Sequence, residues 1–306
     1  MTPLQRYIAE EIAIDHADGI LTRREALRRL TLLGFGVTAA GALLAACTGG
    51  DNGITDSAPS PATPSPPPTS PSAPPGSATA ATTTAITFGG PDGKQLQAAW
   101  AAAPQPRGGV LVIHENKGLT DHIRSVTGRF AGAGYSALAV DLLSAQGGTA
   151  AFTDPAAATA ELSRIPQEQF VADLRSGLDE LQRRVEGKKL GTTGFCFGGG
   201  LVWLLLASGP SPLSAATPFY GPFPGNGDLS ASKAAVLAIY AAADTRVNAS
   251  RPAAEAALVR AGDPHEIFIA PDADHAFFND TGPRYNATAA TEAWRRVLDW
   301  YGTYLG

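Results

Sequence analysis

Cys196 lies at the centre of a glycine-rich stretch that could carry covalent chemistry. Residues 189–200 read KLGTTGFCFGGG, which predicts a buried strand, a sharp turn at Cys196 and the start of a helix. A residue at the apex of such a turn is forced towards positive φ, and a side chain with a Cβ tolerates this only beside small neighbours. Gly194, Gly198 and Gly199 supply them. The turn would raise the sulfur to a helix N-terminus, where the dipole and free amides favour a thiolate.

The spacing Gly-x-Cys-x-Gly-Gly is that of a nucleophile elbow, with sulfur in place of the usual hydroxyl. The alternative is a buried structural cysteine in a nucleotide-binding loop. However, the stretch has neither the Gly-Lys-Ser/Thr ending nor the Gly-x-Gly-x-x-Gly spacing of phosphate-binding loops. The pattern therefore favours a nucleophile.

Asp244 and His275 complete a candidate catalytic triad, because each follows a predicted strand just as Cys196 does. The order nucleophile, acid, histidine is the order of the α/β-hydrolase triad. His275 would take the thiol proton and later protonate the leaving group, and Asp244 would hold the imidazole tautomer. Taken singly, His275 could be an idle loop histidine and Asp244 a helix cap. Their joint occurrence at successive strand ends favours catalysis.

The elements that must position these residues alternate between strands and helices. An antiparallel hairpin is expected over residues 85–88 and 95–100. Further strands are expected over 109–114, 136–140, 215–220, 235–241 and 265–270, and helices over 122–133, 167–185, 201–207, 251–261 and 288–304. Residues 144–166 are a candidate cover for the site. The alternation predicts an α/β fold with a mostly parallel central sheet and helices on both faces, and its active site at the carboxyl ends of the strands.

Four motifs together resemble the dienelactone hydrolase family, and the resemblance runs from about residue 85 to the end of the chain. They are ENKG at 115–118, GFCFGG at 194–199, Asp244 after three alanines, and HAF at 275–277. The resemblance implies an α/β-hydrolase fold and cleavage of an ester or lactone through an acyl-thioester, without a cofactor. It also implies that Glu115 helps to generate the thiolate, and that the backbone amides of Phe197 and Asn116 form the oxyanion hole.

The sequence departs from that family at the residues that bind a substrate carboxylate. The family's prototypes carry arginines shortly after strand four and a few residues after the catalytic histidine, whereas residues 141–145 and 275–279 contain none. Acceptance of an anionic lactone is therefore an open question. The candidate replacements are Arg124, Arg246 and Arg284.

Other kinds of site are less well supported. His114 and Glu115 resemble the start of a zinc-protease helix, but position 118 is glycine and the context is a strand. Asp272, Asp274 and His275 could hold a cation, although such short acidic loops are usually solvated. The tryptophans at helical spacing are expected in the core: Trp203, Trp294 and Trp300. We therefore expect no metal. The net charge is −5 and the charged residues are scattered along the chain, so we expect no basic surface that would bind nucleic acid.

The N-terminal 47 residues read as an export signal. An arginine-rich stretch, residues 23–29, precedes the uncharged segment 30–46, which is short for a membrane-spanning helix and typical of a signal peptide. Residues 22–28 resemble a twin-arginine signal, with general secretion as the alternative. Residues 44–47, LAAC, resemble a bacterial lipobox, so Cys47 is the expected site of lipidation. An uncleaved anchor helix is the alternative.

Residues 48–84 are dominated by Pro, Ser, Thr and Ala and predict a disordered tether. The expected organisation is thus an export signal over 1–47, a linker over 48–84 and a hydrolase domain over 85–306. We expect an exported lipoprotein on the outer face of the bacterial cell membrane, monomeric, acting on a small ester or lactone. The alternatives are a lipid-anchored binding protein on a degenerate hydrolase scaffold, and an acyltransferase.

Overall fold

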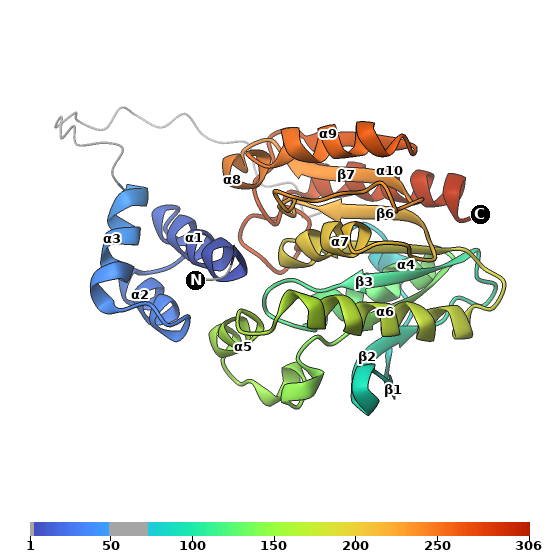
Figure 1. The fold of residues 1–306 in the computed structure, drawn as a ribbon, viewed down its shortest axis with the longest axis horizontal. Helices are drawn as coiled ribbons and strands as arrows, with labels where there is room; N and C mark the ends of the chain where they lie inside the picture. The colour runs from blue at the N-terminus through green and yellow to red at the C-terminus, as the bar shows by residue number, and fades with distance from the viewer. Residues whose placement is uncertain (1–2, 49–72) are drawn as a thin grey trace. The chain divides into compact units, whose positions relative to one another are not determined.

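The computed structural model describes residues 3–48 and 73–306, which belong to two compact units (Figure 1). The chain divides after Ser72, and the larger unit is Ala73–Gly306. Most of the predicted tether, residues 49–72, lies outside the described residues.

The described residues of the N-terminal unit, 3–48, form the helices α1 (Pro3–Ala17), α2 (Arg23–Leu32) and α3 (Val37–Thr48). The Thr22 side chain caps α2 by accepting a hydrogen bond from the Glu25 amide at 3.3 Å. Glu25 also pairs with Arg28 and Arg29, at 2.7 Å each, so the arginine-rich stretch is helical. Within residues 3–48 and 73–306, none of the helices combines the length and apolar character that a membrane crossing requires.

The larger unit is built on an eight-stranded sheet in the order β1-β2-β4-β3-β5-β6-β7-β8. β1 and β2 pair antiparallel as a hairpin, β2 pairs antiparallel with β4, and the remaining neighbours pair parallel. The strands are β1 (Thr84–Gly89), β2 (Gln95–Ala101), β3 (Gly108–Ile113), β4 (Tyr135–Val140), β5 (Leu190–Phe195), β6 (Leu213–Phe219), β7 (Ala235–Ala241) and β8 (His265–Ala270). The mostly parallel sheet predicted from the alternation is confirmed.

Helices cover both faces of this sheet (Figure 1). The helices of this unit are α4 (Asp121–Gly132), α5 (Pro155–Leu162), α6 (Gln167–Arg184), α7 (Phe197–Ala207), α8 (Thr245–Asn248), α9 (Arg251–Ala261) and α10 (Ala287–Tyr304). α4 and α10 lie together on one face, where the rings of Phe130 and Trp294 are 4.7 Å apart. α6 and α7 pack on each other and on the central strands. The short helices α5 and α8 are not in the predicted set.

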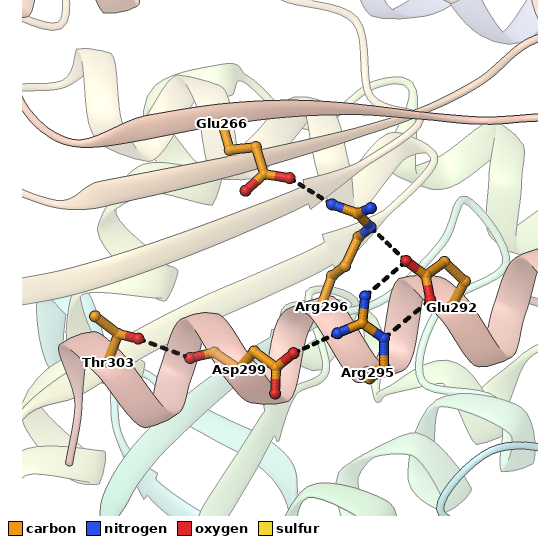
Figure 2. A network of polar contacts seen from close by, with 6 residues as sticks. All are labelled: Glu266, Glu292, Arg295, Arg296, Asp299 and Thr303. Atoms are coloured by element: carbon orange, nitrogen blue, oxygen red, sulfur yellow. Dashed lines mark hydrogen bonds and ion pairs between the residues drawn. The ribbon is translucent and has the colours of Figure 1, made fainter.

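The central strands β3, β4, β5 and β7 are buried along their whole length, and all of them except β5 have largely apolar sequences. Burial of such runs supplies most of the stability of an α/β domain. α10 is amphipathic, with Trp294, Val297 and Tyr301 buried. On its other face Arg295 and Arg296 share Glu292, and Arg296 reaches Glu266 of β8 at 2.6 Å (Figure 2). This set of side chains is called the α10 network below.

Residues 73–83 differ from the tether predicted from their composition, because they lie against α4 and α10. The Ala81 amide donates to the Gly128 carbonyl at 2.9 Å. A Cβ added to Gly132 would lie 2.0 Å from the Thr79 carbonyl oxygen, and one added to Gly76 would lie 2.9 Å from the Trp294 ring. The backbone of this segment therefore follows a groove that exists because α4 carries glycine at two positions.

Candidate active site

Cys196 occupies the sharp turn between β5 and α7, with φ 57° and ψ −118°. The glycines around Cys196 are required because the backbone of this turn packs directly against neighbouring backbone, which leaves no room for a Cβ. A Cβ on Gly194 would lie 2.2 Å from the Gly198 carbonyl oxygen, and one on Gly198 would lie 2.4 Å from that of Ile113. A Cβ on Gly199 would lie 2.3 Å from the Phe219 carbonyl oxygen. The strained apex and its requirement for small neighbours agree with the prediction.

Asp244 and His275 meet at the carboxyl ends of β7 and β8. His275 Nδ1 lies 2.6 Å from Asp244 Oδ2, and both side chains are buried. The other carboxylate oxygen, Oδ1, accepts the Val247 amide at 3.1 Å, so Asp244 also caps α8. Burial acts to raise the pKa of Asp244, but its bonds with His275 and with the Val247 amide outweigh burial and lower it below 3.8. The carboxylate is thus fixed in its ionised form beside the imidazole.

The Cys196 sulfur and a ring nitrogen of His275 lie within 4.8 Å of each other. Burial acts to lower the pKa of His275, yet the charge of the Cys196 thiolate and the bonds to Asp244 and Cys196 raise it well above 6.5. A thiolate at Cys196, once it forms, therefore favours an imidazolium at His275. The structure brings together the three predicted residues Cys196, His275 and Asp244.

Glu115 follows β3 and is buried, and a Cβ on Gly198 of the elbow helix would lie 2.5 Å from the carbonyl oxygen of the preceding residue, His114. Its Oε2 accepts a hydrogen bond of 2.6 Å from Asn279 Nδ2. Asn279 is fixed in turn, because its Oδ1 accepts bonds from the Thr281 amide at 3.0 Å and the Thr281 hydroxyl at 2.7 Å. In this structure the Glu115 carboxylate is thus held by a neutral amide.

The amides expected to form an oxyanion hole sit at the ends of two strands. Phe197 is the first residue of α7, and its amide is one of those at the positive end of the helix. Asn116 directly follows Glu115, and its carbonyl accepts the Thr159 hydroxyl of α5 at 2.8 Å. Thr149 likewise accepts the Leu119 amide at 2.8 Å. Residues 144–166 thus hold the loop after β3 in place.

His114 has a structural role. Its Nδ1 lies 2.7 Å from the Glu115 carbonyl and its Nε2 accepts the Leu142 amide at 3.2 Å. Burial lowers the pKa of His114, which keeps the ring neutral. Both ring nitrogens are engaged by the backbone, and a metal ligand would need one of them.

The three candidate arginines lie on different elements. Arg246, in α8, is close enough to lower the pKa of Asp244. Arg284 Nε lies 3.4 Å from Asp274 Oδ2, so this acid of the candidate cation loop has an ionic partner. Arg124 is half-buried in α4.

Sequence reasoning missed two residues of the site, Tyr220 and Asn279. Tyr220 follows β6 and its ring lies edge-on to His275, with centroids 5.2 Å apart. Its place at a strand end is the signal that could have found it, because the same criterion found Cys196 and Asp244. Nothing in the sequence pairs Asn279 with Glu115, which is 164 residues away.

The sequence model of the dienelactone hydrolase family matches residues 96–305. The chain belongs to the dienelactone hydrolase family. It is 34% identical over 214 residues to an Escherichia coli (strain K12) protein named as a carboxymethylenebutenolidase, covering 64% of this chain and 77% of that protein. A Saccharolobus solfataricus protein of the same name is 31% identical over 241 residues, covering 67% of this chain and 93% of the other.

Solved structures agree with the family assignment. A crystal structure titled as a dienelactone hydrolase from Klebsiella pneumoniae superposes with a TM-score of 0.63 at 32% identity, covering 72% of this chain and 99% of that one. A dienelactone hydrolase-like promiscuous phosphotriesterase from metagenomic libraries gives 0.63 at 26% identity, covering 74% of this chain and 100% of the other. This dienelactone hydrolase family member is therefore an α/β-hydrolase-fold enzyme that cleaves ester or lactone bonds.

Proposed function

We propose that this enzyme hydrolyses a small carboxylic ester or lactone through a thioester on Cys196. The observation that carries the proposal is the sulfur of a strained elbow within 4.8 Å of an imidazole that a carboxylate holds at 2.6 Å. The thiolate would attack the carbonyl carbon, and the Phe197 and Asn116 amides would stabilise the oxyanion. His275 would protonate the leaving alkoxide and then deprotonate the water that cleaves the thioester. Asp244 would hold the ring.

Glu115 would take part before the attack by accepting the thiol proton when substrate binds and passing it to His275, which then holds the proton that the leaving alkoxide takes. Its burial, its neutral partner Asn279 and its place directly after His114, whose backbone touches the elbow helix at Gly198, support this role. An acyltransferase would use the same thioester with an alcohol or amine in place of water, and no observation here favours that acceptor over water.

The test is Cys196→Ala, assayed with a neutral aryl acetate. Removal of the nucleophile is expected to reduce turnover by at least about a thousandfold, while far-UV circular dichroism stays unchanged. Mass spectrometry of a rapidly quenched reaction should show an acetyl group on Cys196 in the wild type. Unchanged turnover by the variant would contradict the proposal.

We also propose that the protein is an exported lipoprotein attached to the outer face of the cell membrane through Cys47. The support is the arginine-rich start of α2, the uncharged segment that follows and LAAC at 44–47. Cys47→Ser is expected to shift the protein from the membrane to the soluble fraction, because one thiol is the point of acylation. A matched Ser57→Ala variant should stay on the membrane. Membrane association of the Cys47→Ser protein would favour an uncleaved anchor instead.

A further inference from the structure

His114 is a fully buried polar side chain directly after β3, the strand beside the elbow strand. The last residue of β3, Ile113, pairs with Gly194 of β5. The His114 backbone touches the elbow helix at Gly198, and its ring centroid is 6.2 Å from that of Phe197, the first residue of α7. His114 thus lies beside Phe197 and two residues before Asn116, the residues whose amides are expected to form the oxyanion hole.

The backbone fixes the tautomer of the His114 ring. The Leu142 amide lies 3.2 Å from Nε2, and an amide N–H can only donate, so Nε2 carries the lone pair. The proton of the neutral ring is then on Nδ1, which lies 2.7 Å from the Glu115 carbonyl oxygen, an acceptor only. Burial lowers the pKa of His114, which keeps the ring neutral. Each ring nitrogen therefore has the one role that its partner allows.

The bond from Nδ1 acts on one particular peptide unit. The Glu115 carbonyl belongs to the same peptide as the Asn116 N–H, and in a trans peptide these two groups point in opposite directions within one plane. A donor that fixes the direction of the carbonyl therefore fixes the direction of the N–H. The Gly118 amide also donates to this carbonyl, at 3.2 Å, so a tight turn and the His114 ring hold it together. Hydrogen bonding at the carbonyl also polarises the peptide, which makes the N–H a better donor.

We propose that His114 is a positioning residue of the oxyanion hole, whose Nδ1–H aims the Asn116 amide at the substrate oxygen that becomes negative. The inference deepens the proposed function and rests on it. The Phe197 amide is part of α7 and is held by helical backbone, whereas Asn116 lies in a turn. Amides stabilise an oxyanion strongly only when they are already oriented before the reaction. The His114 ring supplies that orientation for the amide that no helix holds.

The test compares His114→Met with His114→Gln in the full chain. The two side chains are similar in size, but only glutamine keeps an N–H donor and an acceptor side by side, as the imidazole does. With a neutral aryl acetate we expect His114→Met to lower kcat at least about tenfold at nearly unchanged KM, because the lost alignment acts mainly on the transition state. His114→Gln should recover most of that loss. A wild-type kcat in His114→Met overturns the proposal, and so does an equal loss in both variants.

Alkylation of Cys196 separates the positioning of the hole from damage to the nucleophile. In the reaction with iodoacetamide the thiolate displaces iodide from a saturated carbon, and no oxyanion forms. Mass spectrometry of the Cys196 peptide gives the rate constant, which should be the same in wild type, His114→Met and His114→Gln. If His114→Met loses alkylation in the same proportion as turnover, the elbow itself is disturbed and the proposal is lost.

Tyr301→Phe is the matched control. Tyr301 lies in α10, is equally buried, and its hydroxyl donates to the Thr192 carbonyl of β5 at 2.8 Å. The substitution thus removes a buried bond to a backbone carbonyl that is not part of the expected hole. It should lower the Tm and leave kcat unchanged. A loss of kcat as large as that of His114→Met would mean a general effect of buried hydrogen bonds, and would count against the proposal.

Nitrogen NMR of the wild type keeps the inference testable if the His114 variants are unfolded by circular dichroism. In ¹⁵N-labelled protein the His114 ring should show a protonated Nδ1 and an unprotonated Nε2, and a proton on Nε2 overturns the proposal. The spectrum needs no substrate. An inactive Cys196→Ala with a fully active His114→Met removes this inference alone, whereas an active Cys196→Ala removes the proposed function and this inference with it.

Discussion

The α10 network and the His275–Asp244 pair contain ionic contacts of the same length in opposite surroundings. Arg296 lies 2.6 Å from Glu266, and His275 lies 2.6 Å from Asp244. The side chains of Arg296 and Glu266 are 32% and 44% exposed, whereas those of His275 and Asp244 are 7% and 5% exposed. Water screens the first contact and cannot replace the second. Contact length alone therefore says little about what an ion pair does.

Asp244→Asn should have the largest effect on stability, because it removes one partner of the buried His275–Asp244 pair. Removing one partner of a buried pair typically costs about 3 kcal/mol. We expect a loss of that size in the free energy of unfolding near pH 6, measured with urea. A loss as small as that expected for a surface pair would show that the site is well solvated.

The same Asp244→Asn loss should depend on pH. Because the folded pKa of Asp244 lies below its ordinary 3.8, its contribution is present above that value and is lost as pH falls through the folded pKa. Because the folded pKa of His275 lies above 6.5, its contribution is complete below 6.5 and is lost as pH rises through the folded pKa. Urea titrations from pH 2 to 10 should show the largest difference between about pH 4 and 6.5.

Glu115→Gln tests an intermediate case, a buried carboxylate held by an amide rather than by a cation. The isosteric amide keeps the size of the side chain but cannot accept the Cys196 proton. We expect acylation by an aryl ester to slow at least about tenfold, or about 1.4 kcal/mol, in stopped-flow measurements. Glu161→Gln, a partly exposed residue of α5, is the matched control. Equal acylation rates for wild type and Glu115→Gln would exclude the proposed role.

Glu266→Gln should have the smallest effect. It removes the Arg296 contact of the α10 network, and exposed pairs of this kind contribute about 0.2–1 kcal/mol. We expect a change in the free energy of unfolding within that range, and a smaller one in 0.5 M salt, in the same urea assay. A loss that matches Asp244→Asn would remove the distinction between the two settings.

Much of the fold, and the positions that form the candidate triad, could be predicted because both follow from local rules. Continuous apolar runs predicted buried strands such as β3 and β7, and position just after a predicted strand singled out Cys196, Asp244 and His275. The helix α8 was missed because four residues carry no periodicity. The contact of Asn279 with Glu115 was missed because it depends on side-chain directions across two loops, which neighbouring sequence does not encode.

The predicted start of the folded unit, residue 85, was also wrong: the unit begins at Ala73, and the difference has a physical cause. Residues 73–83 have the composition of a tether, but Gly128 and Gly132 leave room on α4 for backbone to lie there. Docking of this kind depends on the receiving surface, and the composition of the docked segment gives no sign of it.

The placement of residues 73–83 has a practical consequence for anyone who shortens the gene. A protein that begins at Thr84 would lack residues 73–83. The backbone of α4 at Gly128 and Gly132 and part of the Trp294 ring would then be exposed to solvent. Expression trials of the isolated enzyme should therefore begin no later than Ala73.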